Sequence, residues 1–156
     1  MSMQDLDLAM DLIFREGIGR FNGPQPESLI RRAEQALDVR FPPTYRRFLS
    51  CLGRGGIAPD DIHGLTDERF EGFPDVVWLT LDARRITPSY PRSYILVSTT
   101  GDGGDYCIDV SQTTPEGDSP IVERWFDEPG GTRIAYDDFG AFLLDLVRHG
   151  ASSLEM

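Results

Sequence analysis

The chain has 156 residues, 40% of them hydrophobic and nine of them Phe, a length of about one domain and a composition that excludes a disordered chain. Fifteen basic residues, all of them Arg, face 26 acidic residues, and the net charge is -11. An acidic field of this size repels nucleic acid and anionic lipid, and it attracts cationic partners. We therefore expect one domain over residues 1–156, with no nucleic-acid or membrane partner.

The acidic charge is concentrated in one part of the chain. Residues 1–59 carry eight Arg and seven acids, a net charge of +1. Residues 60–138 carry 17 acids and six Arg, a net charge of -11. The whole excess of acidic charge therefore lies in the middle and second half of the chain.

The spacing of the two cysteines and the lack of an export signal predict the cellular location of the protein. Cys51 and Cys107 lie far apart, with no CxxC or Cys/His cluster, which argues against a disulfide framework and a zinc site. The first residues are acidic and amphipathic, unlike a signal peptide, and no apolar run approaches the roughly 20 residues of a bilayer crossing. We expect a cytoplasmic protein.

Apolar spacing predicts helices along the first half of the chain. The first covers 5–16, with Leu6, Met10, Ile13 and Phe14 on one side, and the second covers 27–38. A third begins after the two prolines at 42–43 and ends at the glycines of 53–56. The stretch 57–74 is acidic and irregular and is expected on the surface. For 75–86 a strand is an alternative, but the spacing and a possible Asp75 cap favour a helix.

Strand patterns follow, and a helix closes the chain. Strands are predicted at 94–97, 105–110 and 121–126, the first two joined as an antiparallel hairpin by the Gly-rich turn at 99–105. After a turn at 127–131, Asp137 or Asp138 can cap a last helix that runs to Gly150. Helices, then a meander of strands, then a helix define an α+β fold.

Residue patterns of the common enzyme classes are absent from the sequence. The lack of Lys excludes a P-loop and a Schiff base, and neither a G-x-S-x-G nor an H-E-x-x-H pattern occurs. His63 and His149 are expected to be structural or simply exposed. Asp105 and Asp109 share a strand face but lie about 13 Å apart, beyond the about 5–9.5 Å of glycosidase acid pairs. We therefore expect no catalytic residues, no cofactor and no metal.

Four motifs, in their order and spacing, resemble the SUKH superfamily in its Smi/Knr-type branch. They are LIRRAEQALDVRFPPTYRRFLSCLGRGGI (29–57), YILVSTTGDGGDYCIDVS (94–111), PIVERWFDE (120–128) and IAYDDFGAFLLDLV (134–147). The match covers about 27–148. Phe41 stands where the family usually has Leu, and Gly-Arg-Gly-Gly (53–56) replaces its Asn-Gly-Gly, with the same packing and turn chemistry.

The resemblance implies a bent antiparallel β-sheet flanked by helices. It also implies a function, because many bacterial members look like immunity proteins that bind and neutralise polymorphic toxins, often nucleases or deaminases with basic substrate grooves. An acidic inhibitor can occupy such a groove. Other relatives look like intracellular regulators or scaffolds of cell-wall assembly, which leaves a regulator with an endogenous partner as the alternative.

The sequence thus predicts a non-catalytic protein that binds a basic toxin domain through acidic loops. The predicted contact residues are Asp60, Asp61, Asp67, Glu68, Glu71, Asp102, Asp118, Asp127 and Glu128. A third hypothesis is an enzyme or small-molecule binder that uses Asp102, Asp105 and His63. A deep pocket around a carboxylate of perturbed pKa would favour it.

Overall fold

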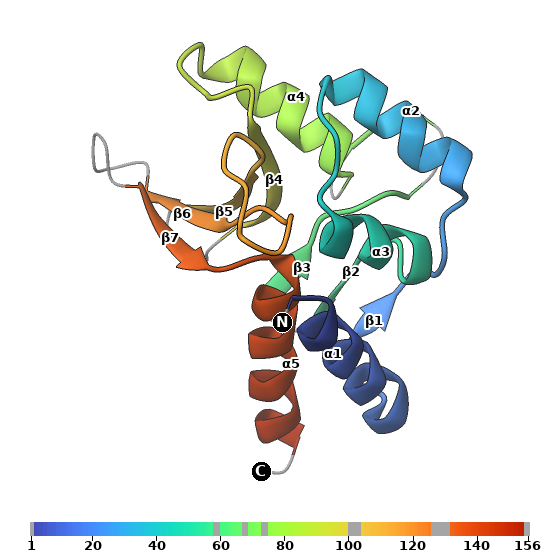
Figure 1. Ribbon diagram of the computed structural model, residues 1–156. Coiled ribbons are helices and arrows are strands. Elements are labelled where there is room, and N and C mark those ends of the chain that lie inside the picture. Colours follow the sequence, from blue (N-terminus) through green and yellow to red (C-terminus); the bar gives the residue numbers. More distant parts are fainter. Residues whose placement is uncertain are drawn as a thin grey trace.

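The computed structural model describes residues 2–57, 60–66, 69–72, 75–99, 104–125 and 132–154, which form an α+β fold (Figure 1). Its helices are α1 (Ser2–Glu16), α2 (Glu27–Leu37), α3 (Pro43–Cys51), α4 (Val76–Ile86) and α5 (Phe139–Leu154). Its strands are β1 (Arg20–Phe21), β2 (Gly55–Ile57), β3 (Asp60–Ile62), β4 (Tyr94–Thr99), β5 (Gly104–Asp109), β6 (Ile121–Trp125) and β7 (Thr132–Tyr136). None of the helices in these ranges is both long and apolar enough to cross a membrane.

The first three helices are formed where the apolar spacing predicts them. α2 buries Leu29, Ile30, Ala33 and Leu37 and ends where Asp38 adopts the left-handed conformation, at a φ of 55°. Asp is one of the few residues with a side chain that tolerate this region. α1 buries Leu6, Met10 and Ile13. Phe14 was predicted on the same side of the helix, but its side chain is 68% exposed, so this prediction is wrong.

The glycines that follow α3 have two different roles. Pro43 occupies the first turn of α3 as predicted, and Gly53 ends the segment with a φ of 75°. Gly55 and Gly56, expected to belong to the same helix exit, instead lie in strand β2. A Cβ on Gly55 would collide with the carbonyl oxygen of Arg20 on the neighbouring strand β1, so the close pairing of these strands requires glycine there.

A small antiparallel sheet of order β1-β2-β3 replaces part of the predicted surface stretch 57–74. Ile62 and Leu65 are fully buried, and the N–H of His63 donates to the carbonyl of Val97 on β4, at 2.7 Å. The prediction of an irregular surface segment is therefore wrong for this part. Strands of three residues carry too little alternation to be recognised by their pattern.

The larger sheet is an antiparallel meander of order β4-β5-β6-β7. The predicted β4–β5 pairing is confirmed, with Ile95 opposite Ile108 and a register shift between Leu96 and Ser98. β7 lies between the predicted turn at 127–131 and the predicted start of the last helix, where no strand was predicted, and α5 continues beyond the predicted end at Gly150. Asp138 is the residue that caps α5, since its carboxylate accepts from the N–H of Ala141 at 2.9 Å.

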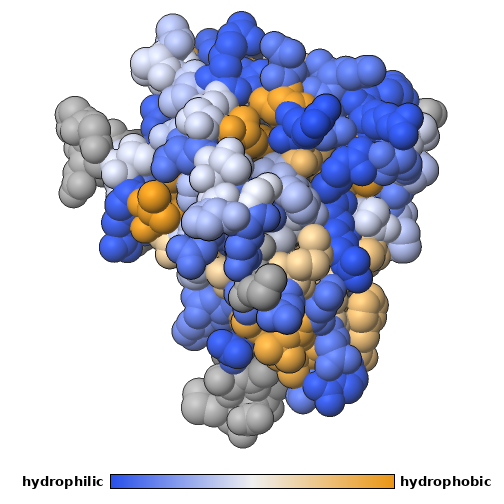
Figure 2. Space-filling view, in the orientation of Figure 1, coloured by the Kyte–Doolittle hydropathy of each residue, from blue (hydrophilic) through white to orange (hydrophobic). Residues whose placement is uncertain are grey.

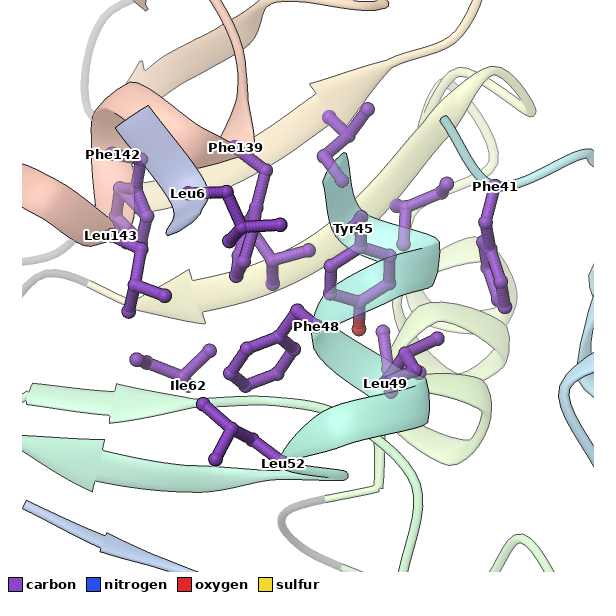
Figure 3. Packing of buried hydrophobic residues seen from close by; sticks show 14 of the residues in the cluster. Leu6, Phe41, Tyr45, Phe48, Leu49, Leu52, Ile62, Phe139, Phe142 and Leu143 are labelled. Carbon is purple, nitrogen blue, oxygen red and sulfur yellow. The ribbon is translucent and has the colours of Figure 1, made fainter. Parts of the chain in front are cut away.

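The face of the molecule seen in Figure 2 is hydrophilic over α2, whereas apolar side chains gather where α1 and α5 lie side by side. Beneath them the core joins both sheets to α1, α3 and α5 through a group of stacked and edge-on aromatic rings (Figure 3). The ring centroids of Tyr45 and Phe139 are 5.0 Å apart, as are those of Phe48 and Phe139. This arrangement fixes α3 and α5 relative to each other and holds the surfaces around them in place.

Helix α4 covers the opposite face of the larger sheet. Asp75 caps it as predicted, because its carboxylate accepts from the N–H groups of Val77 and Trp78 at 2.9 and 3.0 Å. A smaller apolar cluster of Tyr90, Leu96, Cys107 and Val122 packs there, with Leu79 of α4 against it. The larger sheet is therefore buried on both faces along β4 and β5, which explains the continuous apolar run of β4.

Candidate binding site

Three of the predicted acidic contact residues lie on the described surface. Asp61 and Glu71 are exposed and Asp60 is partly buried. Asp60 and Asp61 belong to β3, whereas Glu71 follows Phe70, whose ring lies beneath the Arg32 guanidinium of α2. Five of the predicted contact residues fall outside the described residues; they are Asp67, Glu68, Asp102, Asp127 and Glu128.

Asp60 and Asp61 form a local acidic site at the β2–β3 hairpin. Burial and the neighbouring charge of Asp61 raise the pKa of Asp60 above its usual value, and His149 on α5 acts in the opposite direction. Glu71, in contrast, lies close to α2. Asp60 and Asp61 therefore lie together beside α5, whereas Glu71 lies beside α2.

Asp118 is buried and cannot present its side chain to a partner. It is 2% exposed, and its carboxylate accepts from the N–H and the hydroxyl of Thr44, at 3.1 and 3.2 Å. The N–H of Ser119 donates to the same carboxylate at 2.9 Å. Its expected role in contacting a partner is wrong, because the fold uses this carboxylate to hold the 110–120 loop against the start of α3.

His63 has a structural role. Its side chain is fully buried, Nδ1 lies 3.1 Å from the Leu96 carbonyl, and its own carbonyl accepts from the Tyr45 hydroxyl at 2.7 Å. Burial lowers its pKa. A histidine so enclosed has no access to a substrate. His63 is therefore excluded as one of the three residues of the predicted small-molecule site.

Asp105 lies on the face of β5 that α4 partly covers, and its pKa is perturbed. The carboxyl is 4% exposed, and burial raises its pKa to about 6, with Arg124 on the neighbouring strand acting in the opposite direction. The Arg124 guanidinium lies 4.9 Å above the Tyr90 ring. Asp105 lies outside the linings of the two hollows described next, so neither of them supports the enzyme hypothesis.

The surface hollow nearest to α3 lies between the 38–43 link, the start of α3 and the loop that joins β5 to β6. It encloses about 730 Å³ and is lined by Arg31, Glu34, Arg40, Phe41, Pro42, Pro43, Arg46, Val110, Thr113, Gly117, Asp118 and Ser119. A second hollow of about 430 Å³ adjoins it and shares Arg31, Glu34 and Arg40. The two adjoining hollows are together named here the α2–α3 groove. Figure 1 shows the 38–43 link and the β5–β6 loop facing the same side.

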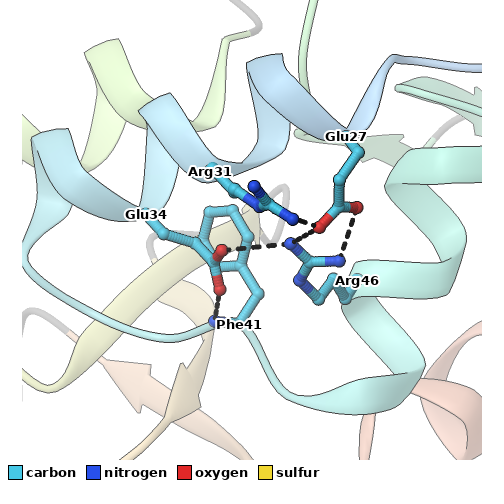
Figure 4. A network of polar contacts seen from close by, with 5 residues as sticks. All are labelled: Glu27, Arg31, Glu34, Phe41 and Arg46. Carbon is cyan, nitrogen blue, oxygen red and sulfur yellow. Dashed lines mark hydrogen bonds and ion pairs between the residues drawn. The ribbon is translucent and has the colours of Figure 1, made fainter.

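An ion-pair network stabilises one wall of the groove (Figure 4). Arg46 makes two hydrogen bonds to Glu27, and its guanidinium also lies 3.3 Å from Glu34. Glu34 in turn accepts from the N–H of Phe41 at 2.8 Å. The hydrogen bond from Arg46 lowers the pKa of Glu27, and the same bond raises the pKa of Arg46. Arg46 is therefore engaged within the protein.

Two other arginines present their charge to solvent at the groove. The side chain of Arg31 is 70% exposed and forms an ion pair with Glu27 at 3.4 Å, and Arg40 is exposed. The structure gives Arg40 no hydrogen bond or ion pair with a described residue. Sequence reasoning missed this site, although the net positive charge of residues 1–59 was the signal that could have indicated it.

These surfaces carry charged side chains that can bind groups of opposite charge. Among the described residues, no three His, Cys, Asp or Glu side chains are grouped so that they could hold a metal ion. Both cysteines are free thiols. The hairpin with Asp60 and Asp61 offers carboxylates to a cationic partner, whereas the groove carries both guanidinium groups and the exposed carboxylate of Asp38.

The helices, the two antiparallel sheets and the closing helix α5 define the α+β class, and the motifs lie on them in the predicted order. Comparison with known families gives a match over residues 10–148 to SUKH_5, described as SMI1-KNR4 cell-wall. The chain belongs to this family, and its assignment to the SUKH superfamily is confirmed. No curated protein matches the sequence.

Proposed function

We propose that this chain is a non-catalytic, cytoplasmic immunity protein that binds a basic toxin domain and blocks its substrate groove. The observation that carries the proposal is the concentration of acidic charge in residues 60–138, a net of -11, in a member of the SUKH family. A nuclease or a deaminase that acts on nucleic acid has a basic groove, and an acidic surface competes with the nucleic acid for it.

The surface that supports this function best is the β2–β3 hairpin. Asp60 and Asp61 lie beside each other there, and burial, together with the repulsion between the two carboxylates, raises the pKa of Asp60. A cationic partner would relieve this repulsion, so association is favoured electrostatically. The exposed Glu71 adds acidic charge elsewhere on the surface.

A regulator with an endogenous partner is the second candidate function. The observation that favours it is the description of the matched family, which names the cell wall. Such a protein would also act by binding, so the two candidates differ in the partner and in the consequence of losing the chain.

Co-expression separates these functions. A candidate toxin gene from the same genome is expressed in a sensitive host with the wild-type chain, with an Asp60→Lys/Asp61→Lys variant, or without the chain. The proposal expects survival with the wild-type chain and reduced survival with the variant, because charge reversal slows association with a basic partner. Lack of protection against every toxin encoded beside this gene would favour the regulator.

A further inference from the structure

We propose that Asp105 is a pH-dependent switch, which decides whether the Arg124 guanidinium stacks on the Tyr90 ring or pairs with the Asp105 carboxylate. The segment that responds is residues 87–93, which join α4 to β4 and are named here the Tyr90 turn. We expect this turn to be held more firmly on the larger sheet when Arg124 stacks on Tyr90. The inference concerns the chain by itself and does not depend on the toxin-binding proposal.

Asp105 and Arg124 are direct neighbours across two strands. They are paired in the register of β5 and β6, so both side chains point to the same face of the larger sheet. Opposite residues of an antiparallel pair have Cβ atoms about 4.5–5.5 Å apart, which places the carboxyl within reach of a long Arg side chain. Arg124 is also the charged residue that acts on the ionisation of Asp105.

The Asp105 carboxyl is buried without a hydrogen bond. It is 4% exposed, and no hydrogen bond or ion pair joins it to another described residue. Burial raises its pKa to about 6, because an ionised carboxyl in such a place needs a cation beside it. Asp109, on the same face of β5, differs, since Ser111 and Gln112 donate to its carboxylate. Ionisation therefore creates a need for a new partner at Asp105 and not at Asp109.

The Arg124 guanidinium has two alternative partners on this face. It lies over the Tyr90 ring, 4.9 Å from the ring centroid, which is a favourable position for a cation. A hydrogen bond between two charged groups is stronger than such a contact at a partly exposed site. The neutral Asp105 carboxyl therefore leaves Arg124 on the ring, and the ionised carboxylate attracts it away.

Tyr90 fastens the turn to the larger sheet. Its ring packs in the smaller apolar cluster, and its hydroxyl lies 3.2 Å from the Cys107 sulfur on β5. Its N–H donates to the Thr87 carbonyl at 2.9 Å, so the position of the ring and the shape of the turn are linked. When Arg124 leaves, one face of the ring loses its cover. We therefore expect the turn to open locally more often in the ionised state.

The other titratable groups around this site do not take the place of Arg124. Arg84 of α4 also acts on Tyr90, but its guanidinium donates to the Arg92 carbonyl at 2.9 Å. The Cys107 thiol is fully buried, and burial raises its pKa to about 12, so it stays neutral. Burial likewise raises the pKa of Tyr94 on β4. A change of charge near neutral pH on this face is therefore assigned to Asp105.

The test is an NMR titration of the full-length protein from about pH 4 to 8. It follows the carboxyl carbon of Asp105, the Nε proton of Arg124 and the exchange of the Tyr90 amide. Stacking on the ring shields the Nε proton, and pairing with a carboxylate shifts it downfield. We expect this downfield shift in the same step in which Asp105 ionises. In that step the protection of the Tyr90 amide should fall about two- to fivefold, the equivalent of one cation–π contact.

Three variants separate the contributions to the switch. Asp105→Asn imitates the neutral acid, and Arg124 should stay on the ring at every pH. Asp109→Asn is the matched control, because it removes an acid from the same strand face, and the step at Arg124 should remain. Tyr90→Phe keeps the ring without the hydroxyl, so the downfield shift of the Arg124 proton should also remain.

Three outcomes would overturn the proposal. The first is that Asp105 ionises in the wild type while the Arg124 proton keeps its position. The second is that the step at Arg124 persists in Asp105→Asn or is lost equally in Asp109→Asn. The third is an equal loss of protection at the amide of Val39, which bonds to the Glu34 carbonyl at the end of α2. That result would show a general loss of stability and not a local opening of the Tyr90 turn.

Discussion

Thr44 and Asp118, 74 residues apart in the sequence, are joined by two hydrogen bonds, one from the Thr44 N–H and one from its hydroxyl. Both residues are buried. The pair connects the first turn of α3 to the loop between β5 and β6, so one contact both satisfies a free N–H of the helix start and positions a wall of the groove. An acidic residue that looks like part of a charged surface in the sequence is here a structural anchor.

Removal of this anchor should destabilise the protein. Asp118→Ala leaves the buried N–H and hydroxyl of Thr44 without their acceptor, and we expect a loss of about 1–3 kcal/mol in the free energy of unfolding. Urea denaturation measures it. Asp137→Ala, at an exposed acid before α5, is the control and should change stability little. Equal effects of the two substitutions would contradict the assignment.

A second prediction concerns the contribution of the Asp75 cap of α4 to the stability of the protein. Asp75→Ala removes the acceptor for the first N–H groups of α4 and should cost about 0.5–2 kcal/mol. Asp75→Asn retains an oxygen at this position and should retain a large part of the stability. Thermal unfolding of both variants checks the prediction. If Asn is as damaging as Ala, the carboxylate is needed for a reason other than capping.

Glu34→Ala should release the link between α2 and α3. The substitution removes the acceptor of the Phe41 N–H and one of the two partners of Arg46, and we expect a loss of about 1–3 kcal/mol. Amide hydrogen exchange should show faster exchange at Phe41. Ala at the neighbouring Gln35, whose side chain lies on the exposed part of α2, serves as the control. Unchanged exchange at Phe41 would refute the role given to Glu34.

Asp105 should make stability depend on pH. Burial raises the pKa of Asp105 to about 6 in the folded protein from an ordinary 3.8, so the folded state holds the proton more tightly than the unfolded state. The resulting stabilisation is complete below about pH 4 and is lost as the pH rises through 6. We expect the wild type to lose on the order of 2–3 kcal/mol between pH 4 and 7 relative to Asp105→Asn. A constant difference between the two proteins across this range would contradict the shifted pKa.

The sequence was sufficient to predict the longer elements. Helices α2 and α4, the Asp75 cap and the β4–β5 pairing follow from periodicity and local turn chemistry, which depend only on neighbouring residues. The small sheet of β1, β2 and β3 was missed, because its strands are two or three residues long and are stabilised by pairing between segments far apart. β7 was missed for a similar reason, since its residues are mostly exposed and show no apolar run.

The candidate site was harder to predict, because charge alone does not show which side chains are engaged within the protein. Asp118 and Glu34 carry the same formal charge as Asp61, but hydrogen bonds from Thr44 and Phe41 remove the first two from the surface chemistry. Arg40 is prominent only because the structure leaves it without a partner among the described residues, whereas Arg46 is engaged. Whether a charged side chain is engaged within the protein or left for a partner depends on tertiary contacts, which sequence patterns do not show.

The central claim, that the chain binds a basic protein through its acidic hairpin, is tested most directly by affinity capture from the chain's own cells. The tagged wild type and the Asp60→Lys/Asp61→Lys variant are compared at low and moderate salt, and the bound proteins are quantified by mass spectrometry. We predict one basic, toxin-like protein at near-equal stoichiometry on the wild type, reduced by salt and by charge reversal. Equal recovery of that protein on both baits, or recovery of housekeeping proteins only, would contradict the account.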